Sequence, residues 1–238
     1  MKDLKRAGGV AALIAAATVI VGLGMFATAL SDYTSGDPDT GEALAYVADH
    51  QATMYVWNFV TLVVFGIALV FVAPALYDRM KAGADPLMRL ASGVGLVWAG
   101  LLIAGGMVLN VGMGRVVDLS TTDPEAAGSA WFVIESIGNA LSGQIEIVGA
   151  IWILLVSLAA LRTRALPAAL NYLGFAMAVS ALATVIPALE MVAVVFGLGL
   201  IVWFGWVGII LVRNAPATEP LEPRPAPDRR VVEAELSR

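Results

Sequence analysis

The sequence of 238 residues contains no cysteine and only one histidine, His50. The lack of cysteine excludes disulfide bonds, zinc–thiolate sites, iron–sulfur clusters and thiol nucleophiles. One histidine is too few for bis-histidine haem ligation or for a two-histidine zinc motif. The chain has no glycine-rich phosphate-binding loop, and its formal net charge of −5 argues against nucleic acid as a partner. The sequence therefore predicts no cofactor and no metal site.

Charged residues are also scarce, at 14% of the chain, whereas 59% of the residues are hydrophobic. A soluble globular domain is about one quarter charged and half apolar. A water-facing fold of this length cannot bury so much apolar surface, so lipid must be the solvent for most of the chain. These proportions predict an integral membrane protein.

Six apolar segments are predicted to cross the bilayer as helices. A crossing helix needs about 20 apolar residues, because about 30 Å of hydrocarbon is covered at about 1.5 Å per residue. The apolar run 147–161 is too short alone and spans only if its helix continues through Gln144 and Glu146. A tight outer turn is predicted at 187–190. The predicted fold class is all-α, a six-helix transmembrane domain over 1–213 with spans at about 7–30, 52–77, 87–114, 129–161, 168–186 and 190–212.

The basic residues fall on one side of this topology. Of the 14 lysines and arginines, only Arg115 lies in a connection predicted to be on the outer side. Because cytoplasmic loops carry an excess of Lys and Arg, both termini are predicted to be cytoplasmic. The first apolar run is longer than that of a secretory signal, so we expect an uncleaved first helix. The proline-punctuated segment 214–238 is predicted to be a disordered cytoplasmic tail.

Two helix starts are predicted outside the membrane. In the first outer loop, Asp39 is expected to cap a short helix that Leu44, Tyr46 and Val47 lay on the bilayer surface. In the second outer loop, an aspartate followed by Pro124 predicts that the fourth long helix begins near residue 124.

One face of the fourth span is polar. Glu135, Asn139, Ser142 and Glu146 are spaced four, three and four residues apart, which places them on the same face of an α-helix. A polar stripe that faces lipid is heavily penalised, so we expect this face to point into the bundle. Glu146 is the predicted centre of the site, because ionisable groups inside a membrane are functional candidates by default.

The height of a residue above the cytoplasmic end of its helix is the number of residues between them multiplied by about 1.5 Å. By this measure, polar residues on neighbouring helices lie at matching heights. The lower tier contains Glu146, Asn58 and Asn110. The upper tier contains Glu135, Arg115 and His50. Trp152 lies near the bilayer middle, as the floor of a cavity or as simple packing, and Trp57 and Trp131 fit the outer aromatic belt. No catalytic residue is assigned, and the candidate ligand-binding residues are Glu146, Asn58, Asn110, Asn139, Ser142, Glu135, Arg115, His50 and Trp152.

The last third of the chain carries motifs that resemble a known family. Residues 146–155 read Glu-Ile-Val-Gly-Ala-Ile-Trp-Ile-Leu-Leu, and residues 166–174 read Leu-Pro-Ala-Ala-Leu-Asn-Tyr-Leu-Gly. Residues 195–204 read Val-Phe-Gly-Leu-Gly-Leu-Ile-Val-Trp-Phe. This pattern resembles an uncharacterised family of bacterial multipass membrane proteins, the 4386 type of domain of unknown function. The resemblance implies a six-helix protein of the bacterial inner (plasma) membrane and supplies no catalytic residues.

Three functions remain open from the sequence. The first is binding or transport of a small ligand, lipid or ion through a polar pocket near the outer leaflet. The second is a structural or accessory subunit of a membrane complex, whose polar tiers only fix the helix register. The third, an enzyme with Glu146 as acid or base, lacks any recognisable nucleophile–base pair. The expected partners are membrane lipids, a small molecule or ion, and a second copy of the chain or a membrane complex.

Overall fold

A computed structural model of the chain describes residues 2–30, 40–142 and 146–213, and every regular element within these ranges is helical. The elements in chain order are α1 (Lys2–Ala27), α3 (Thr40–Asp49), α4 (Gln51–Asn58), the π-helix η1 (Phe59–Val64), α5 (Phe65–Ser120), α6 (Pro124–Ser142), α7 (Ile147–Thr163), α8 (Ala168–Ala183), the 3₁₀-helix η2 (Pro187–Val192) and α9 (Ala193–Arg213).

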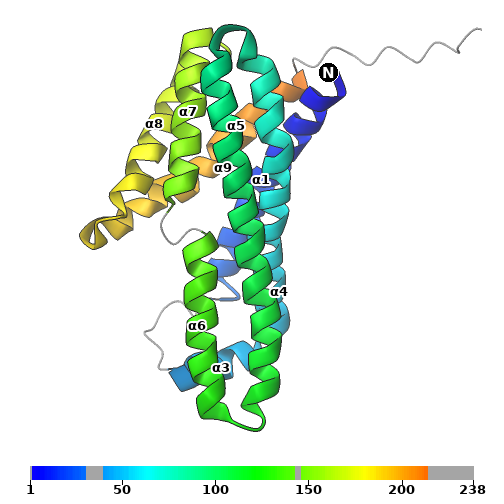
Figure 1. Ribbon diagram of the computed structural model, residues 1–238, viewed down its shortest axis with the longest axis vertical. Helices are drawn as coiled ribbons and strands as arrows, with labels where there is room; N and C mark the ends of the chain where they lie inside the picture. The colour runs from blue at the N-terminus through cyan, green and yellow to red at the C-terminus, as the bar shows by residue number, and fades with distance from the viewer. Residues whose placement is uncertain (1, 31–39, 143–145, 214–238) are drawn as a thin grey trace, which may run out of the picture.

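The longest feature is a helical hairpin formed by α4, η1 and α5 (Figure 1). The chain reverses within α5 at Ala84, whose φ of −149° and ψ of 36° are not helical. Pro86 follows two residues later, in the first turn of the second arm, where a missing amide hydrogen costs little. Each arm has more than 30 residues and is therefore about 50 Å long, longer than the hydrocarbon core of a bilayer.

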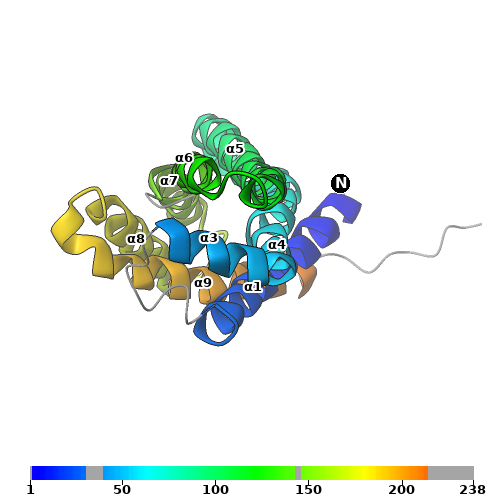
Figure 2. The same ribbon diagram turned by 90° about the horizontal axis from the view of Figure 1, so that it is seen from below.

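The other helices pack around the two ends of this hairpin. Near the turn, α7 lies against α5, α8 lies against α7 and α9, and α1 lies between α5 and α9. At the opposite end, α6 lies against α5, and α3 crosses the end of the bundle, as seen from below in Figure 2.

A large apolar core fills the part of the bundle near the hairpin turn. Its centre is a group of buried aromatic rings from α5, α7 and α9, with centroids 5.1–6.4 Å apart. The rings are those of Phe65, Trp98, Trp152, Phe196, Trp203 and Phe204. Edge-to-face and offset contacts of this kind stabilise a core beyond the area that they bury.

A second apolar core lies at the other end and corrects one prediction. The helix predicted in the first outer loop exists as α3, but its apolar face does not lie on the bilayer surface. Leu44 and Val47 are 6% and 0% exposed, because they pack with Met113 and Trp131 of α5 and α6. The ends of the long hairpin and α6 offer α3 a protein surface on which to bury this face. Asp39, the predicted cap, lies outside the described residues.

The fourth predicted span, 129–161, contains parts of two described helices. The helix α6 ends at Ser142 and α7 begins at Ile147, and Glu146 between them has a non-helical ψ of 41°. The Ser142 hydroxyl donates a hydrogen bond to the Gly138 carbonyl at 2.7 Å. Gln144 and the predicted tail 214–238 lie outside the described residues.

The described helices confirm the predicted all-α class, and their length and composition are compatible with a membrane protein. Four stretches are long and apolar enough to cross a bilayer, namely Asp3–Ala27, Gln51–Ser120, Pro124–Thr163 and Ala193–Arg213, and α8 is a shorter apolar helix. The second stretch contains both arms of the hairpin. The predicted turn at 187–190 coincides with η2, which joins α8 to α9.

Candidate functional site

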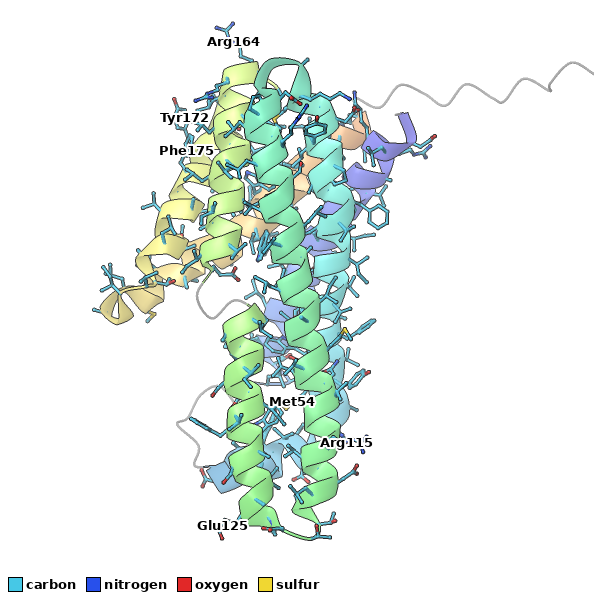
Figure 3. All side chains as sticks on the ribbon, viewed as in Figure 1. Met54, Arg115, Glu125, Arg164, Tyr172 and Phe175 are labelled. Atoms are coloured by element: carbon cyan, nitrogen blue, oxygen red, sulfur yellow. The ribbon has the colours of Figure 1, made fainter. Side chains whose placement is uncertain are left out.

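A cavity of about 150 Å³ lies among α1, α4, α5 and α6. A volume of this size holds about five water molecules or one molecule as large as benzene. Met54, which lines it, lies in the half of the molecule that contains Glu125 and Arg115, whereas Arg164 lies at the opposite end (Figure 3). The lining residues are Phe26, Leu30, Met54, Trp57, Asn58, Leu109, Trp131, Glu135 and Asn139.

One face of α6 supplies the most polar wall of the cavity. Trp131, Glu135 and Asn139 are spaced four residues apart, so their side chains follow one another along that face. Glu135 and Asn139 are half-buried, and Trp131 is 2% exposed. The first two positions of the polar stripe predicted from the sequence thus meet at this cavity.

The two tryptophans in the wall differ in their hydrogen bonding. The indole nitrogen of Trp57 donates to the Gly22 carbonyl at 3.1 Å and so ties α4 to α1. The buried Nε1 of Trp131 has no acceptor among the described residues. A buried donor without an acceptor costs about 1–3 kcal/mol.

Asn58 is held in the cavity wall by Asn110. The amide nitrogen of Asn58 donates to Oδ1 of Asn110 at 3.2 Å, and the amide nitrogen of Asn110 donates to the Tyr55 carbonyl at 3.2 Å. Both asparagines are buried, at 2% and 6% exposed. Asn110 therefore acts as a positioning residue behind Asn58 and does not itself line the cavity.

The structure does not bring Glu146 to this cavity. Its carboxyl group lies beside the Trp98 indole, and neither its Oε2 nor the Trp98 Nε1 has a hydrogen-bond partner among the described residues. Trp98 precedes Asn110 by 12 residues on α5, which corresponds to about 18 Å along the helix. Glu146 therefore does not lie at the common height predicted for it with Asn58 and Asn110.

The other four predicted site residues are also away from the cavity, and one of them, Ser142, lies further along α6 than the lining residues. His50 is exposed, and its ring stacks on that of Tyr46 with centroids 4.1 Å apart. Arg115 is exposed on α5. Trp152 packs against Trp98, Trp203 and Phe204 in the aromatic core, so packing alone accounts for it.

Sequence reasoning missed the aromatic part of the wall. It assigned Trp57 and Trp131 to the aromatic belt at the membrane interface, and it gave Phe26 no role. The signal that would have found Trp131 is its spacing of four residues from Glu135, which extends the polar stripe by one turn of helix.

The arrangement is suited to binding rather than to metal chemistry. No group of three or more histidine, aspartate or glutamate side chains in the described ranges could hold a metal ion. The cavity instead combines one carboxylate, two amides and three aromatic rings. No family model, no curated protein and no solved structure matches the chain.

Proposed function

We propose that this chain is a six-span protein of the bacterial inner membrane, with both termini in the cytoplasm, that binds a small organic cation from the outer side. The observation that carries the proposal is the convergence of Glu135, Asn58, Asn139 and the Trp131 ring on one cavity of about 150 Å³. The bacterial membrane is supported by the family resemblance of the last third of the chain.

The chemistry of the wall favours a cation over an anion. Glu135 is the only ionisable side chain among the described residues that line the cavity, and a carboxyl group complements a cation rather than an anion. The rings of Phe26, Trp57 and Trp131 offer π faces, which attract ammonium groups. The amide oxygens of the two asparagines can accept hydrogen bonds from an N–H donor.

The volume limits the ligand to a short amine or amino alcohol. Cavities that bind drug-sized molecules are about 300–1,000 Å³, several times larger than this one. A molecule the size of benzene fits a cavity of about 150 Å³. Ethylammonium, ethanolamine and choline are of the appropriate size, and a lipid is too large.

The orientation is supported by the distribution of charge between the two ends. One end of the molecule consists of the start of α1, the hairpin turn and the end of α7. It carries Lys5, Arg79, Lys81 and Arg164, whereas Glu125 lies at the other end (Figure 3). Basic residues gather on the cytoplasmic side of membrane proteins, so the turn is assigned to the cytoplasm and the cavity to the outer half.

The bonds between Asn58, Asn110 and the Tyr55 carbonyl favour a second candidate, a structural or accessory subunit in which these polar groups only fix the register of α4 against α5. The two candidates differ in one respect. A binding protein uses Glu135 for its ligand, whereas a purely structural protein has no saturable ligand for that carboxylate.

The test is calorimetric titration of the full-length protein in lipid nanodiscs with ethylammonium, ethanolamine, choline and neutral 1-propanol. Saturable binding is expected for at least one cation and not for the alcohol. Glu135→Gln should raise the Kd about 10- to 150-fold, since hydrogen bonds to charged groups contribute about 1.5–3 kcal/mol. Glu125→Gln, at an exposed position on the same helix, is the matched control and should leave the Kd unchanged. If none of the cations binds, or if Glu135→Gln binds as the wild type does, the proposal is wrong.

A further inference from the structure

A groove of about 460 Å³ runs along the outside of the bundle between α1 and the first arm of α5. It is separate from the cavity of Glu135, with which it shares no lining residue. Val10, Ile14 and Phe71 line it and are 44–47% exposed. Ala7 and Ala11 complete its apolar wall, and Asp3 and Arg6 are the charged residues in the described part of the chain that line it.

This groove has one charged end and an apolar length, as a phospholipid molecule does. Its charged end lies in the first turns of α1. This end is beside the hairpin turn, because Lys5 of α1 forms an ion pair with Asp78. From Asp3 to Ile14 the helix advances 11 residues, about 16 Å, from the membrane interface into the hydrocarbon. A lipid headgroup therefore fits at Asp3 and Arg6, and an acyl chain fits along Val10, Ile14 and Phe71.

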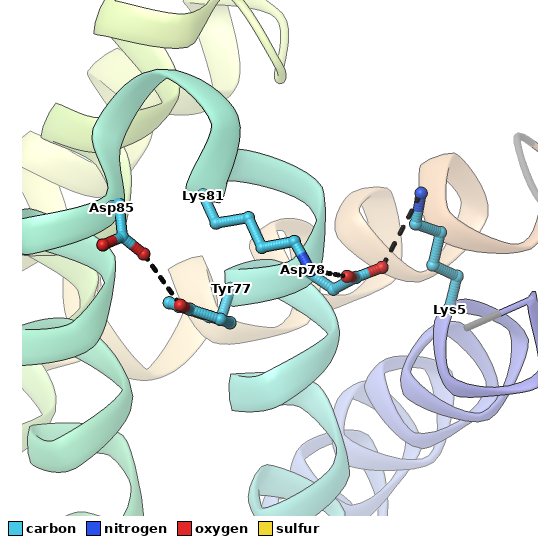
Figure 4. Close-up of polar contacts among 5 residues, drawn as sticks. All are labelled: Lys5, Tyr77, Asp78, Lys81 and Asp85. Carbon is cyan, nitrogen blue, oxygen red and sulfur yellow. Dashed lines mark hydrogen bonds and ion pairs between the residues drawn. The ribbon is translucent and has the colours of Figure 1, made fainter.

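The two charged residues at the mouth are not paired with each other. The ion pairs formed by the described residues are Lys5–Asp78, Lys81–Asp78 and Arg89–Asp85, and none includes Asp3 or Arg6. Lys5, next to Arg6 in sequence, points to Asp78 instead of into the groove (Figure 4). Among the described residues, the mouth of the groove therefore presents one negative and one positive group.

A mouth of this kind complements a headgroup that carries both signs of charge. The guanidinium of Arg6 matches a phosphate, to which arginine can donate two parallel hydrogen bonds. The carboxylate of Asp3 accepts hydrogen bonds from a primary ammonium, whereas the quaternary ammonium of a choline headgroup has no N–H to donate. An anionic headgroup without an ammonium would meet repulsion from Asp3.

We propose that this groove binds a phosphatidylethanolamine molecule of the cytoplasmic leaflet, with its phosphate at Arg6, its ammonium at Asp3 and one acyl chain along α1. The site is independent of the proposed cation cavity. It gives the chain a specific structural lipid at the surface where the first helix meets α5.

The test is native mass spectrometry of the full-length protein in detergent with equal amounts of phosphatidylethanolamine, phosphatidylcholine and phosphatidylglycerol of identical acyl chains. The wild type is expected to retain phosphatidylethanolamine at least threefold over each of the others. Arg6→Gln should abolish this preference. Asp3→Asn should reverse it in favour of phosphatidylglycerol, because the mouth then carries a net positive charge.

Two further variants keep the result interpretable. Arg162→Gln removes an exposed arginine at the end of α7, away from the groove, and should retain the wild-type preference. Ala7→Phe fills the groove without changing its charge and should lower the retention of phosphatidylethanolamine to that of phosphatidylcholine. Equal retention of the three lipids by the wild type, or an unchanged preference in Asp3→Asn, would overturn the proposal. Amine titrations of Arg6→Gln should match the wild type, so failure of this site is distinct from failure of the cation cavity.

Discussion

The amide nitrogen of Asn58 lies 3.2 Å from Oδ1 of Asn110, and this hydrogen bond joins two buried side chains that are 52 positions apart in the chain. It crosses the interface between the two arms of the long hairpin. Since the bond lies within the bundle and Asn58 also lines the cavity, the same contact bears on both the stability of the hairpin and the shape of the site.

Replacing Asn110 with leucine should therefore lower the free energy of unfolding by about 1–3 kcal/mol, because the Asn58 amide is left buried without its acceptor. Chemical unfolding in detergent, followed by tryptophan fluorescence, measures this change. Ser136→Ala, at an exposed position of α6, is the control and should change stability by less than about 0.5 kcal/mol. An Asn110→Leu protein as stable as the control variant would contradict a role for this bond.

The charged residues at the hairpin turn predict how stability depends on pH. Lys81 donates a hydrogen bond to Asp78 at 2.6 Å, and Lys5 lies 3.8 Å from the same carboxylate, so the pKa of Asp78 is lowered (Figure 4). The pKa of Asp85 is also lowered, first by the hydrogen bond from the Tyr77 hydroxyl and then by Arg89. In both cases the folded protein holds the carboxylate in its ionised form.

A carboxylate whose pKa is lower in the folded state stabilises the fold above its unfolded pKa, and this contribution is lost as the pH falls through the folded pKa. An aspartate in an unfolded chain has a pKa of about 3.9, so the thermal unfolding midpoint should fall as the pH drops from about 5 to 3. Asp78→Asn should lower stability by about 1 kcal/mol or less at pH 7 and flatten this profile. A variant that keeps the steep wild-type loss would show that other groups cause it.

Two glycines of α9 should respond in opposite directions to replacement by alanine. A methyl group on Gly208 would lie 2.9 Å from the Gly9 carbonyl oxygen and 2.7 Å from Leu13, so α1 and α9 would have to separate. We expect Gly208→Ala to lower the free energy of unfolding by about 1–3 kcal/mol.

Gly197 has no atom within 4 Å of such a methyl group, so Gly197→Ala is a matched control in the same helix. It should raise stability by up to about 1 kcal/mol, because alanine favours helix over glycine. Thermal unfolding of both variants in the same detergent provides the comparison. Equal effects at the two positions would mean that the contact between α1 and α9 is looser than the structure indicates.

Local signals in the sequence predicted well where helices begin. An aspartate before a proline predicted a start near residue 124, and α6 begins at Pro124 with Asp123 Oδ1 accepting a hydrogen bond from the Ala126 amide at 3.0 Å. The short helix of the first outer loop was also predicted correctly. These signals depend on a few neighbouring residues, which the sequence displays directly.

Features that depend on contacts between distant segments were not predictable in the same way. An amphipathic helix such as α3 presents the same pattern whether Val47 faces lipid or a protein surface. Trp131 likewise has the composition expected of an interfacial residue, and only its packing with α3 and α5 buries it. The height of Glu146 was misjudged because a count of residues along α7 equals a height in the membrane only if neighbouring helices are parallel and their ends level, which the sequence does not display.

The packing of α1 against α9 has a consequence for how the protein is made. Gly9 of α1 packs against Val212 of α9. This face of α1 can therefore be buried only after α9, the last helix that the structure describes, has been synthesised. Between Ala27 and Arg213 the ribosome adds 186 residues, which takes about 10–40 s at typical synthesis rates. Throughout that interval, the face of α1 that will meet α9 is in contact with lipid or with the insertion machinery. A nascent chain released before α9 has left the ribosome would keep this face open and would be a substrate for membrane quality control.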